Sequence, residues 1–251
     1  MWLDVVMTPT ELPAALRAAP GALCATIDVV RATTTLAVIG ERGGRAVRIA
    51  RDVTAARRFA TESPAALLVG ELGGRVPAGF DYSNSPATLA EADLAGREFI
   101  FATTNGTRAI VDCQEYGAGG IVAASLRNAT AIARLALAQP ADGVMVIVCS
   151  GRSDRVALDD TYTAGVIVAI AQRLAGDTTP LECSERALMA AAIAQTAGEP
   201  LAVLRRSEAG LSVIAIGMDS DLISCATLDA TAIIPRVQTI TQGDAMVIGF
   251  A

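Results

Sequence analysis

The stretch Cys24-Ala-Thr-Ile-Asp-Val-Val-Arg-Ala-Thr-Thr-Thr35 passes from a β-branched apolar run through a polar turn into a helix start. We predict a strand over residues 22–30 and then a helix that ends at the Gly43-Gly44 pair. Ligands of open α/β sheets gather at the carboxyl ends of the strands, and helix N-termini favour anions. The stretch therefore predicts an anion site centred on Asp28 and Arg31.

Outward from this stretch, strand and helix signals alternate as far as about residue 175. Such alternation predicts an α/β protein with three layers, in which helices cover both faces of a mostly parallel sheet, and a mixed sheet stays open. We expect one domain over residues 1–251, with a helix-rich C-terminal part from about residue 160 as a candidate subdomain. No internal repeat stands out, and the last strand, over residues 245–250, is expected at an edge of the sheet.

The composition excludes some classes of function. The net charge is −6 and no basic stripe is present, so we expect no binding to nucleic acid. Apolar residues make up 52% of the chain and charged residues 18%, which indicates a large buried sheet or an oligomer interface, and we predict a homodimer on this ground alone. No apolar run is long enough to cross a bilayer and no signal peptide is recognisable, so we expect no membrane association.

The basic and thiol residues narrow the chemistry further. All 20 basic residues are Arg, and the sequence contains neither Lys nor His. The lack of His excludes a Ser-His-Asp triad and most zinc sites, so a metal would be a hard, oxygen-ligated ion such as Mg²⁺. The five Cys are scattered, odd in number and without a Cys-x-x-Cys pair, which is typical of free thiols in a reducing cytoplasm. We therefore expect a cytoplasmic protein that uses carboxylates, thiols, hydroxyls and Arg.

Polar turns follow five of the predicted strands. The carboxyl ends of parallel strands share one edge of a sheet, so hydroxyls, amides, carboxylates and Arg side chains would converge there. A single polar turn is ordinary loop chemistry, whereas several together favour a site. The five turns are Asp28–Arg31, Gly70–Glu71, Thr103–Thr107, Ser125–Asn128 and Cys149–Arg152.

Carboxylates at strand ends, in the long Gly70–Pro86 loop and at a helix start are candidate ligands of Mg²⁺, which proteins often bind through one or two carboxylates. The alternative for each is a helix cap or a solvated loop charge, and for Asp81 this alternative is nearly as good. The sequence leaves open whether Asp28 holds the metal or attacks phosphorus. The candidate metal ligands are Asp28, Glu71, Asp81 and Asp160.

A phosphoester substrate would need positive charge and hydrogen-bond donors, which this acidic chain must concentrate locally. Arg can clamp phosphate, and hydroxyls and N–H groups at helix starts can bind its oxygens, although each hydroxyl could instead cap a helix. We assign catalytic roles to Asp28, Arg31, Asn105 and Arg152, and substrate binding to Thr33, Thr34, Asn84, Ser85, Gly106, Thr107 and Ser150.

The segment from Cys149 to Arg155 offers a competing mechanism. It matches the Cys-x5-Arg loop of cysteine-dependent phosphatases, and it follows a predicted strand as that loop does. Those enzymes need a thiolate of low pKa held by backbone N–H groups. Val156 replaces the hydroxyl that usually follows the Arg, so a phosphocysteine mechanism is kept as an alternative only.

Along the chain lie, in this order, the segments Asp28-Val-Val-Arg-Ala-Thr-Thr-Thr35, Gly70-Glu71, Gly73-Gly-Arg75, Gly79-Phe-Asp-Tyr-Ser-Asn-Ser-Pro86, Thr103-Thr-Asn-Gly-Thr-Arg108, Cys149-Ser-Gly-Arg152 and Leu158-Asp-Asp160. Together these segments resemble the ComB-type 2-phosphosulfolactate phosphatase family, in order and across the whole chain. The resemblance implies a Mg²⁺-dependent phosphatase with an α/β/α fold, which hydrolyses 2-phospho-3-sulfolactate to 3-sulfolactate and phosphate in coenzyme M biosynthesis.

We therefore predict a Mg²⁺-dependent phosphatase that acts on the phosphate ester of a small 2-hydroxy acid, with 2-phosphosulfolactate as the substrate that the resemblance implies. A non-catalytic binder of phosphorylated or sulfonated metabolites is the second hypothesis. It would use the same anion pocket but would not need metal-binding carboxylates, so turnover in the presence of Mg²⁺ separates the two.

Overall fold

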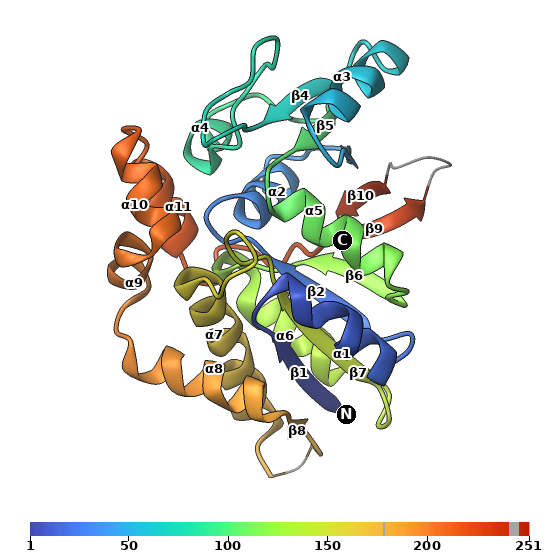
Figure 1. Cartoon of the computed structure of the whole chain (residues 1–251), viewed down its shortest axis with the longest axis vertical. Helices are drawn as coiled ribbons and strands as arrows, with labels where there is room; N and C mark the ends of the chain where they lie inside the picture. Colours follow the sequence, from blue (N-terminus) through green and yellow to red (C-terminus); the bar gives the residue numbers. More distant parts are fainter. Residues whose placement is uncertain (178, 241–245, 251) are drawn as a thin grey trace.

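The protein is built around one large sheet with helices on both faces (Figure 1), which confirms the three-layer α/β prediction. The computed structural model describes residues 1–177, 179–240 and 246–250. Within them the strands are β1 (Trp2–Val6), β2 (Leu23–Ile27), β3 (Ala46–Ile49), β4 (Leu67–Gly70), β5 (Glu98–Ala102), β6 (Gly120–Ala123), β7 (Val144–Cys149), β8 (Glu182–Cys183), β9 (Pro235–Ile240) and β10 (Met246–Phe250).

Helices connect the strands, and the chain after β7 is mainly helical, as predicted. Short 3-10 helices at Pro9–Glu11 and Leu126–Asn128 precede two of them. The α-helices are α1 (Leu12–Ala18), α2 (Ala32–Glu41), α3 (Val53–Glu62), α4 (Pro86–Ala90), α5 (Gly106–Glu115), α6 (Ala129–Leu137), α7 (Leu158–Ala175), α8 (Glu185–Thr196), α9 (Pro200–Arg206), α10 (Glu208–Ala215) and α11 (Ser220–Ala226).

The sheet is mixed and mostly parallel, in the order β4-β5-β3-β10-β9-β6-β2-β7-β1-β8. Strands β4, β5 and β3 are parallel to one another, and so are β6, β2, β7, β1 and β8. Between these two groups, β9 and β10 pair antiparallel with each other and with their neighbours, so the two groups run in opposite directions. The prediction that the last strand lies at an edge is wrong for residues 246–250, while Ala245 lies outside the described residues.

The chain repeats one structural unit, although no repeat was expected. The order strand, helix, strand, helix, strand, turn, helix occurs in β2-α2-β3-α3-β4-α4 and again in β5-α5-β6-α6-β7-α7. Thr33 Oγ1 accepts from the main-chain N–H of Asp28 and donates to its carbonyl, and Thr107 Oγ1 does the same with Thr103. Asp28 and Thr103 therefore occupy equivalent positions in the two structural units. The repeat was not recognisable in the sequence because the side chains at such equivalent positions differ.

Alternate residues of the central strands fill two separate cores. On one face, Ile27 and Ile147 are fully buried in a cluster with residues of α6, α7 and α8. On the other, Cys24 and Val148 are buried in a cluster with residues of α1, α2 and α5. Strands that are covered on both faces read as nearly continuous apolar runs, which is why they were recognisable in the sequence.

The carboxyl ends of β2 and β5 meet although their strand groups run in opposite directions. Each of the helices α2 and α5 leads from one strand group to the other. At their first turns, a Cβ atom placed on Gly106 would lie 2.5 Å from Ala32 Cβ and 2.9 Å from Asp28 Oδ2. The expectation of one shared sheet edge is thus wrong for β4 and β5, and the crossing helices bring the strand ends together instead.

The long Gly70–Pro86 segment is irregular, as predicted, until α4 begins at its final residue. Its first part forms a tight turn closed by an antiparallel bridge between Leu72 and Arg75. The second repeat has the corresponding turn, closed by a bridge between Arg152 and Arg155. We call these two turns the first tip (residues 72–75) and the second tip (residues 152–155).

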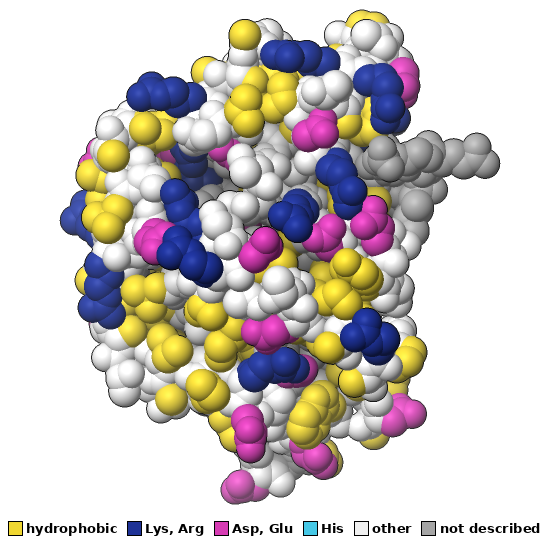
Figure 2. All heavy atoms as spheres, in the orientation of Figure 1, with side chains coloured by type: hydrophobic (Ala, Val, Ile, Leu, Met, Phe, Trp, Pro, Cys, Tyr) yellow, Lys and Arg dark blue, Asp and Glu magenta, His cyan; other side chains and the backbone are white. Residues whose placement is uncertain are grey.

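The surface drawn in Figure 2 carries arginine, acidic and apolar side chains interspersed with one another. Among the described residues, no single helix has the length and apolar character needed to cross a membrane. Helices α8 and α9 meet that criterion only when taken together, and they are bent by 105° relative to each other.

Candidate active site

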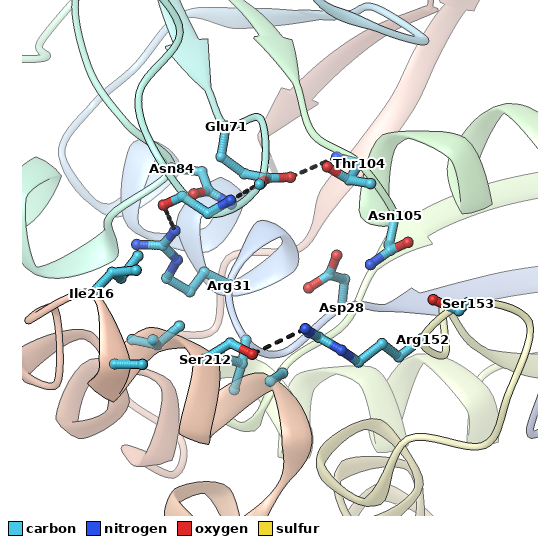
Figure 3. Close-up of a pocket in the computed structure, with 16 residues that line it drawn as sticks. Asp28, Arg31, Glu71, Asn84, Thr104, Asn105, Arg152, Ser153, Ser212 and Ile216 are labelled. Atoms are coloured by element: carbon cyan, nitrogen blue, oxygen red, sulfur yellow. Dashed lines mark hydrogen bonds between the residues drawn. The ribbon is translucent and has the colours of Figure 1, made fainter.

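A cavity of about 450 Å³ lies where the ends of β2, β4, β5 and β7 come together. Figure 3 shows side chains from Glu71, from the second tip, from the β2–α2 and β5–α5 turns and from α10 pointing towards this space. Polar groups from both repeats and apolar groups from α10 line it together. The lining residues used below are Asp28, Arg31, Glu71, Gly73, Gly74, Asn84, Thr104, Asn105, Arg152, Ser153, Ser212, Val213 and Ile216.

Asp28 follows β2 directly and contributes its carboxylate to the cavity (Figure 3). Among the described residues, its side chain accepts one hydrogen bond, a long one of 3.4 Å from the N–H of Ala32. Burial, followed by the negative charge of Glu71, raises the pKa of Asp28 to about 7, and Asp159 adds to the effect. The carboxylate thus lies in a site that disfavours its negative charge and leaves its oxygens available.

Two further carboxylates begin α7, and the structure gives them different surroundings. Burial raises the pKa of Asp159 to about 6, while N–H bonds to its carboxylate and the charge of Arg152 oppose the rise. Asp160 accepts hydrogen bonds of 3.0 Å from the N–H groups of Val29 and Gly151, and it does not line the cavity. Asp160 therefore holds the β2 and β7 turns together, and its predicted metal role is not supported by a position in the cavity.

Glu71 lines the cavity, but both of its oxygens are engaged by main-chain donors. Its Oε1 accepts from the N–H of Thr104 and its Oε2 from the N–H of Gly74, each at 2.7 Å. These bonds tie the first tip to the β5–α5 turn. Glu71 thus raises the pKa of Asp28 through its charge and fixes the loop through its hydrogen bonds.

Arg31 reaches the cavity with a side chain that is only 3% exposed. Its Nη1 donates to Asp221 Oδ2 at 2.7 Å and to the sulfur of Met218, and its Nη2 donates to the carbonyl of Gly74 at 2.9 Å. These three bonds use both N–H groups of Nη1 and one of Nη2, so the guanidinium is largely held by the protein. Direct binding of phosphate by Arg31 stays a prediction.

Arg152 is the more accessible guanidinium, with 38% of its side chain exposed. It extends from the second tip towards Asp28 in Figure 3. Its Nη2 donates to Ser212 Oγ on α10 at 2.9 Å, and its Nε lies 3.6 Å from Glu208. These contacts are partly exposed to solvent, so an anion in the cavity can compete for this guanidinium.

Two polar side chains assigned from the sequence, Asn84 and Asn105, line the cavity with unused hydrogen-bonding capacity, and a third, Ser150, lies next to it. Asn84 is buried, and its Oδ1 has no hydrogen-bond partner among the described residues. Asn105 precedes α5 without capping that helix through its side chain. Ser150 is also buried with an unpartnered Oγ, and it lines a smaller cavity of about 30 Å³ that shares Asn105 with the main one. A buried polar atom without a partner costs free energy unless a ligand or water satisfies it.

The structure places the remaining predicted site residues away from the cavity. Thr34 Oγ1 donates to the carbonyl of Val29, and the bonds of Thr33 and Thr107 given above likewise fix the helix starts. Ser85 caps α4 and donates to Asp221. Asp81 is exposed, and its Oδ2 accepts from the N–H of Leu68. Gly106 is required for packing, as the contact with Asp28 shows. These residues build the site rather than line it.

Cys149 does not have the surroundings of a nucleophile. It is the last residue of β7, it is fully buried and it packs in the core that contains α6 and α7. Burial and the charges of Asp160 and Asp159 raise its pKa well above the ordinary value. Since the thiolate is the reactive form, a phosphocysteine mechanism is disfavoured at this position.

Sequence reasoning missed the contribution of the C-terminal helices. Ser212, Val213 and Ile216 form a wall of the cavity from α10 and its end, and Asp221 on α11 holds Arg31. No motif marks these residues, because their role depends on where α10 and α11 pack.

Comparison with known proteins agrees with this geometry. Residues 6–239 match the model of a family described as 2-phosphosulpholactate phosphatase. The chain belongs to this family. A relative from Deinococcus radiodurans named "Probable 2-phosphosulfolactate phosphatase" is 38% identical over 218 residues, which cover 87% of each chain.

Further members of the 2-phosphosulpholactate phosphatase family carry the same name. The relative from Thermus thermophilus is 36% identical over 209 residues, covering 83% of this chain and 85% of its own. The relative from Parasynechococcus marenigrum is 36% identical over 234 residues, covering 92% and 94%. The activity in these names is that of a phosphoric monoester hydrolase, and the predicted family is thereby confirmed.

Proposed function

We propose that this chain hydrolyses the phosphate ester of a small 2-hydroxy acid in a Mg²⁺-dependent reaction, with 2-phosphosulfolactate as the first candidate substrate. The observation that carries this proposal is the available carboxylate of Asp28 beside the guanidinium of Arg152 in one cavity. The names of the relatives supply the substrate class. Following the family resemblance, we place the reaction in coenzyme M biosynthesis and the protein in the cytoplasm, and its five free thiols fit that compartment.

The donor set in the cavity fits a hard cation. Asp28 and the unpartnered Oδ1 of Asn84 both line it, and oxygen ligands are what Mg²⁺ prefers. Among the described residues, no three acidic or Cys side chains form a metal-binding group. We therefore expect water and substrate oxygens to complete the coordination of the cation. Mg²⁺ commonly uses one or two carboxylates together with waters and substrate oxygens. Asp28 and Asn84 would hold it, and when bound it would supply charge neutralisation at the phosphoryl group.

The residues of the chain have separable roles in this proposal. Arg152 and the N-terminal end of α5, next to Asn105, neutralise the phosphoryl oxygens. Hydrolysis forms a bond between phosphorus and a water oxygen and breaks the ester bond, and the released alkoxide takes up a proton to give the 2-hydroxy acid. Asp28 either receives the proton of the attacking water, or it attacks phosphorus itself and displaces the alkoxide, after which water attacks the phosphorus of the aspartyl phosphate and restores the carboxylate. The configuration at phosphorus of a substrate with a chiral, isotopically labelled phosphoryl group separates these routes, because one displacement inverts it and two displacements retain it.

A passive binder of anions is less consistent with the cavity. Asp28 and Glu71 both contribute carboxylates to it, and like charges in a partly buried site repel a phosphorylated ligand. A cation or a proton is needed before an anion can bind next to them. Carboxylates in the cavity are useful to a catalytic site, which can use them to hold a cation or to take up a proton. A protein that only binds anions would bind them more tightly without these carboxylates.

The proposal is tested by measuring phosphate release from 2-phosphosulfolactate and from other phosphorylated 2-hydroxy acids, with Mg²⁺ and with EDTA. We expect turnover with Mg²⁺, loss of turnover in EDTA, and loss of turnover in Asp28→Asn. Undiminished activity in EDTA would remove the metal from the proposal. Tight binding of all the phosphoesters without turnover would instead establish the binding protein.

A further inference from the structure

Asp221 on α11 is a fully buried acidic side chain, with 0% of its side chain exposed. Its Oδ2 accepts from Arg31 Nη1 at 2.7 Å, and its Oδ1 accepts from Ser85 Oγ at 2.5 Å and from the N–H of Ala87 at 3.2 Å. A buried ion pair often contributes no net stability over an apolar pair of similar size, because both charges lose their hydration. Stability therefore does not explain why the Arg31–Asp221 pair is buried at this place, and we look for the explanation in its position.

The pair begins a continuous chain of hydrogen bonds around the cavity. Arg31 Nη2 donates to the carbonyl of Gly74, and the N–H of Gly74 donates to Glu71. The other oxygen of Glu71 accepts from the N–H of Thr104 (Figure 3). The chain thus joins α11, the β2–α2 turn, the first tip and the β5–α5 turn, and every member except Asp221 lines the cavity.

We infer that Asp221 is a positioning residue for the reaction, which orients Arg31 so that Arg31 holds the first tip over the cavity. The planar guanidinium holds its donors at fixed angles, unlike the ammonium group of Lys, so Arg31 can relay the position of α11 to Gly74. Asp221 touches neither the cavity nor the reacting groups. This inference rests on the proposed function for its catalytic consequence, but the mechanical link to the first tip stands independently.

The same chain offers a matched control. Arg127 forms a half-buried ion pair with Glu41 at 2.6 Å, and its Nη1 also donates to the carbonyl of Ser224 on α11. Neither member of this pair lines the cavity. Glu41→Gln therefore removes an ion pair that anchors α11, as Asp221→Asn does, without touching the chain of bonds to the first tip.

The test compares wild type, Asp221→Asn, Arg31→Lys and Glu41→Gln by hydrogen exchange and by steady-state kinetics. In Asp221→Asn the amide still accepts from Ser85 but loses the charge-assisted bond from Arg31, and Lys at position 31 keeps the charge but cannot span both partners. We expect both variants to speed exchange over residues 70–76 by about tenfold or more. We expect kcat/KM of Asp221→Asn to fall by about 10–100-fold, as for partners that orient catalytic groups. Glu41→Gln should change neither.

The outcomes are distinguishable. Unchanged exchange over residues 70–76 in both variants, or an equal loss of kcat/KM in Glu41→Gln, overturns the inference. Faster exchange with normal kcat/KM overturns the inference that Asp221 positions groups for the reaction. If the wild type hydrolyses none of the phosphoesters, the proposed function fails, and the exchange rates still decide whether Asp221 holds the first tip. Arg31→Lys keeps that decision possible if Asp221→Asn does not fold.

Discussion

At the scale of single residues, the site depends on how each charged group is engaged by its neighbours. The two arginines of the cavity show this, because Arg31 is buried with three protein partners whereas Arg152 keeps a partly exposed guanidinium. The carboxylates differ in the same way, since both oxygens of Glu71 accept short bonds and those of Asp28 do not. Residue type alone cannot separate such pairs, so Arg31 and Arg152 had looked equivalent in the sequence.

Arg152→Ala should lower kcat/KM for phosphoesters by about 100-fold, since it removes a donor aimed at the phosphoryl oxygens. Arg155→Ala is the matched control, because Arg155 sits on the same tip and pairs with Glu208 but does not line the cavity. Loss of an exposed ion pair changes free energies by less than about 1 kcal/mol, so this variant should stay within about fivefold of wild type. Equal effects of both variants would contradict the role of Arg152.

The raised pKa of Asp28 predicts a pH dependence of stability in the metal-free protein. Below pH 3.8 the Asp28 carboxyl is protonated in both the folded and the unfolded state. As the pH rises towards about 7, the carboxyl ionises in the unfolded state first, which lowers the free energy of the unfolded state relative to the folded state. Each pKa unit corresponds to about 1.4 kcal/mol, so Asp28 lowers the free energy of unfolding at pH 8 by at most about 4 kcal/mol. Chemical denaturation should show Asp28→Asn to be more stable than wild type at pH 8, with the difference vanishing near pH 4.

Adding Mg²⁺ provides the control for this measurement. A cation that binds Asp28 should stabilise wild type at pH 8 and leave Asp28→Asn unchanged, because only the folded wild type offers the carboxylate site. Equal stabilisation of both proteins would show that Mg²⁺ binds elsewhere.

At the scale of elements, the contact between the first turns of α2 and α5 creates the site. The two helices come from equivalent places in the two repeats, and their close approach puts Asp28 of one repeat beside Asn105 and Gly106 of the other. The missing side chain at position 106 is what permits this approach. The Asn-Gly pair had been interpreted as a turn with N–H groups for phosphate, and its packing role was not visible without the partner helix.

Gly106→Ala should therefore destabilise the protein by about 1–3 kcal/mol and lower activity, because the new methyl group would overlap Ala32 and displace Asp28. Gly120→Ala serves as the control. The methyl group there would meet only the end of the Leu23 side chain at 3.1 Å, which can move aside. Thermal unfolding and kcat/KM of both variants check the prediction, and normal activity in Gly106→Ala would contradict it.

At the scale of the whole molecule, the two repeats share one sheet through an exchange of strands. Strand β5 of the second repeat lies between β3 and β4 of the first, and β2 of the first lies between β6 and β7 of the second. Each repeat therefore depends on a strand of the other to complete the hydrogen bonding of its part of the sheet. The C-terminal helices then close the cavity that forms between them, with α10 as its apolar wall.

The predicted homodimer is a property of the whole molecule as well. Several large apolar side chains of the C-terminal helices are exposed, among them Met189, Leu211 and Ile223, each more than half exposed. Association of two chains would remove such exposed apolar side chains from water, which favours a dimer. Light scattering coupled to size-exclusion chromatography should give about twice the chain mass of 25.7 kDa. A mass of one chain at high concentration would contradict the prediction.

The sequence by itself determined the α/β class, the strand ends that carry polar turns and the family, because apolar periodicity, Gly and Pro positions and specific short motifs are local properties. Asp28, Asn84, Asn105 and Arg152 were recognisable in this way, since their residue types suit anion and metal chemistry. The tertiary structure decided that Arg31 is held by Asp221 and that Asp81 and Asp160 lie outside the cavity. It also decided that β10 lies in the interior of the sheet. Those features depend on partners up to 190 residues away, and only the packing of the folded chain selects such partners.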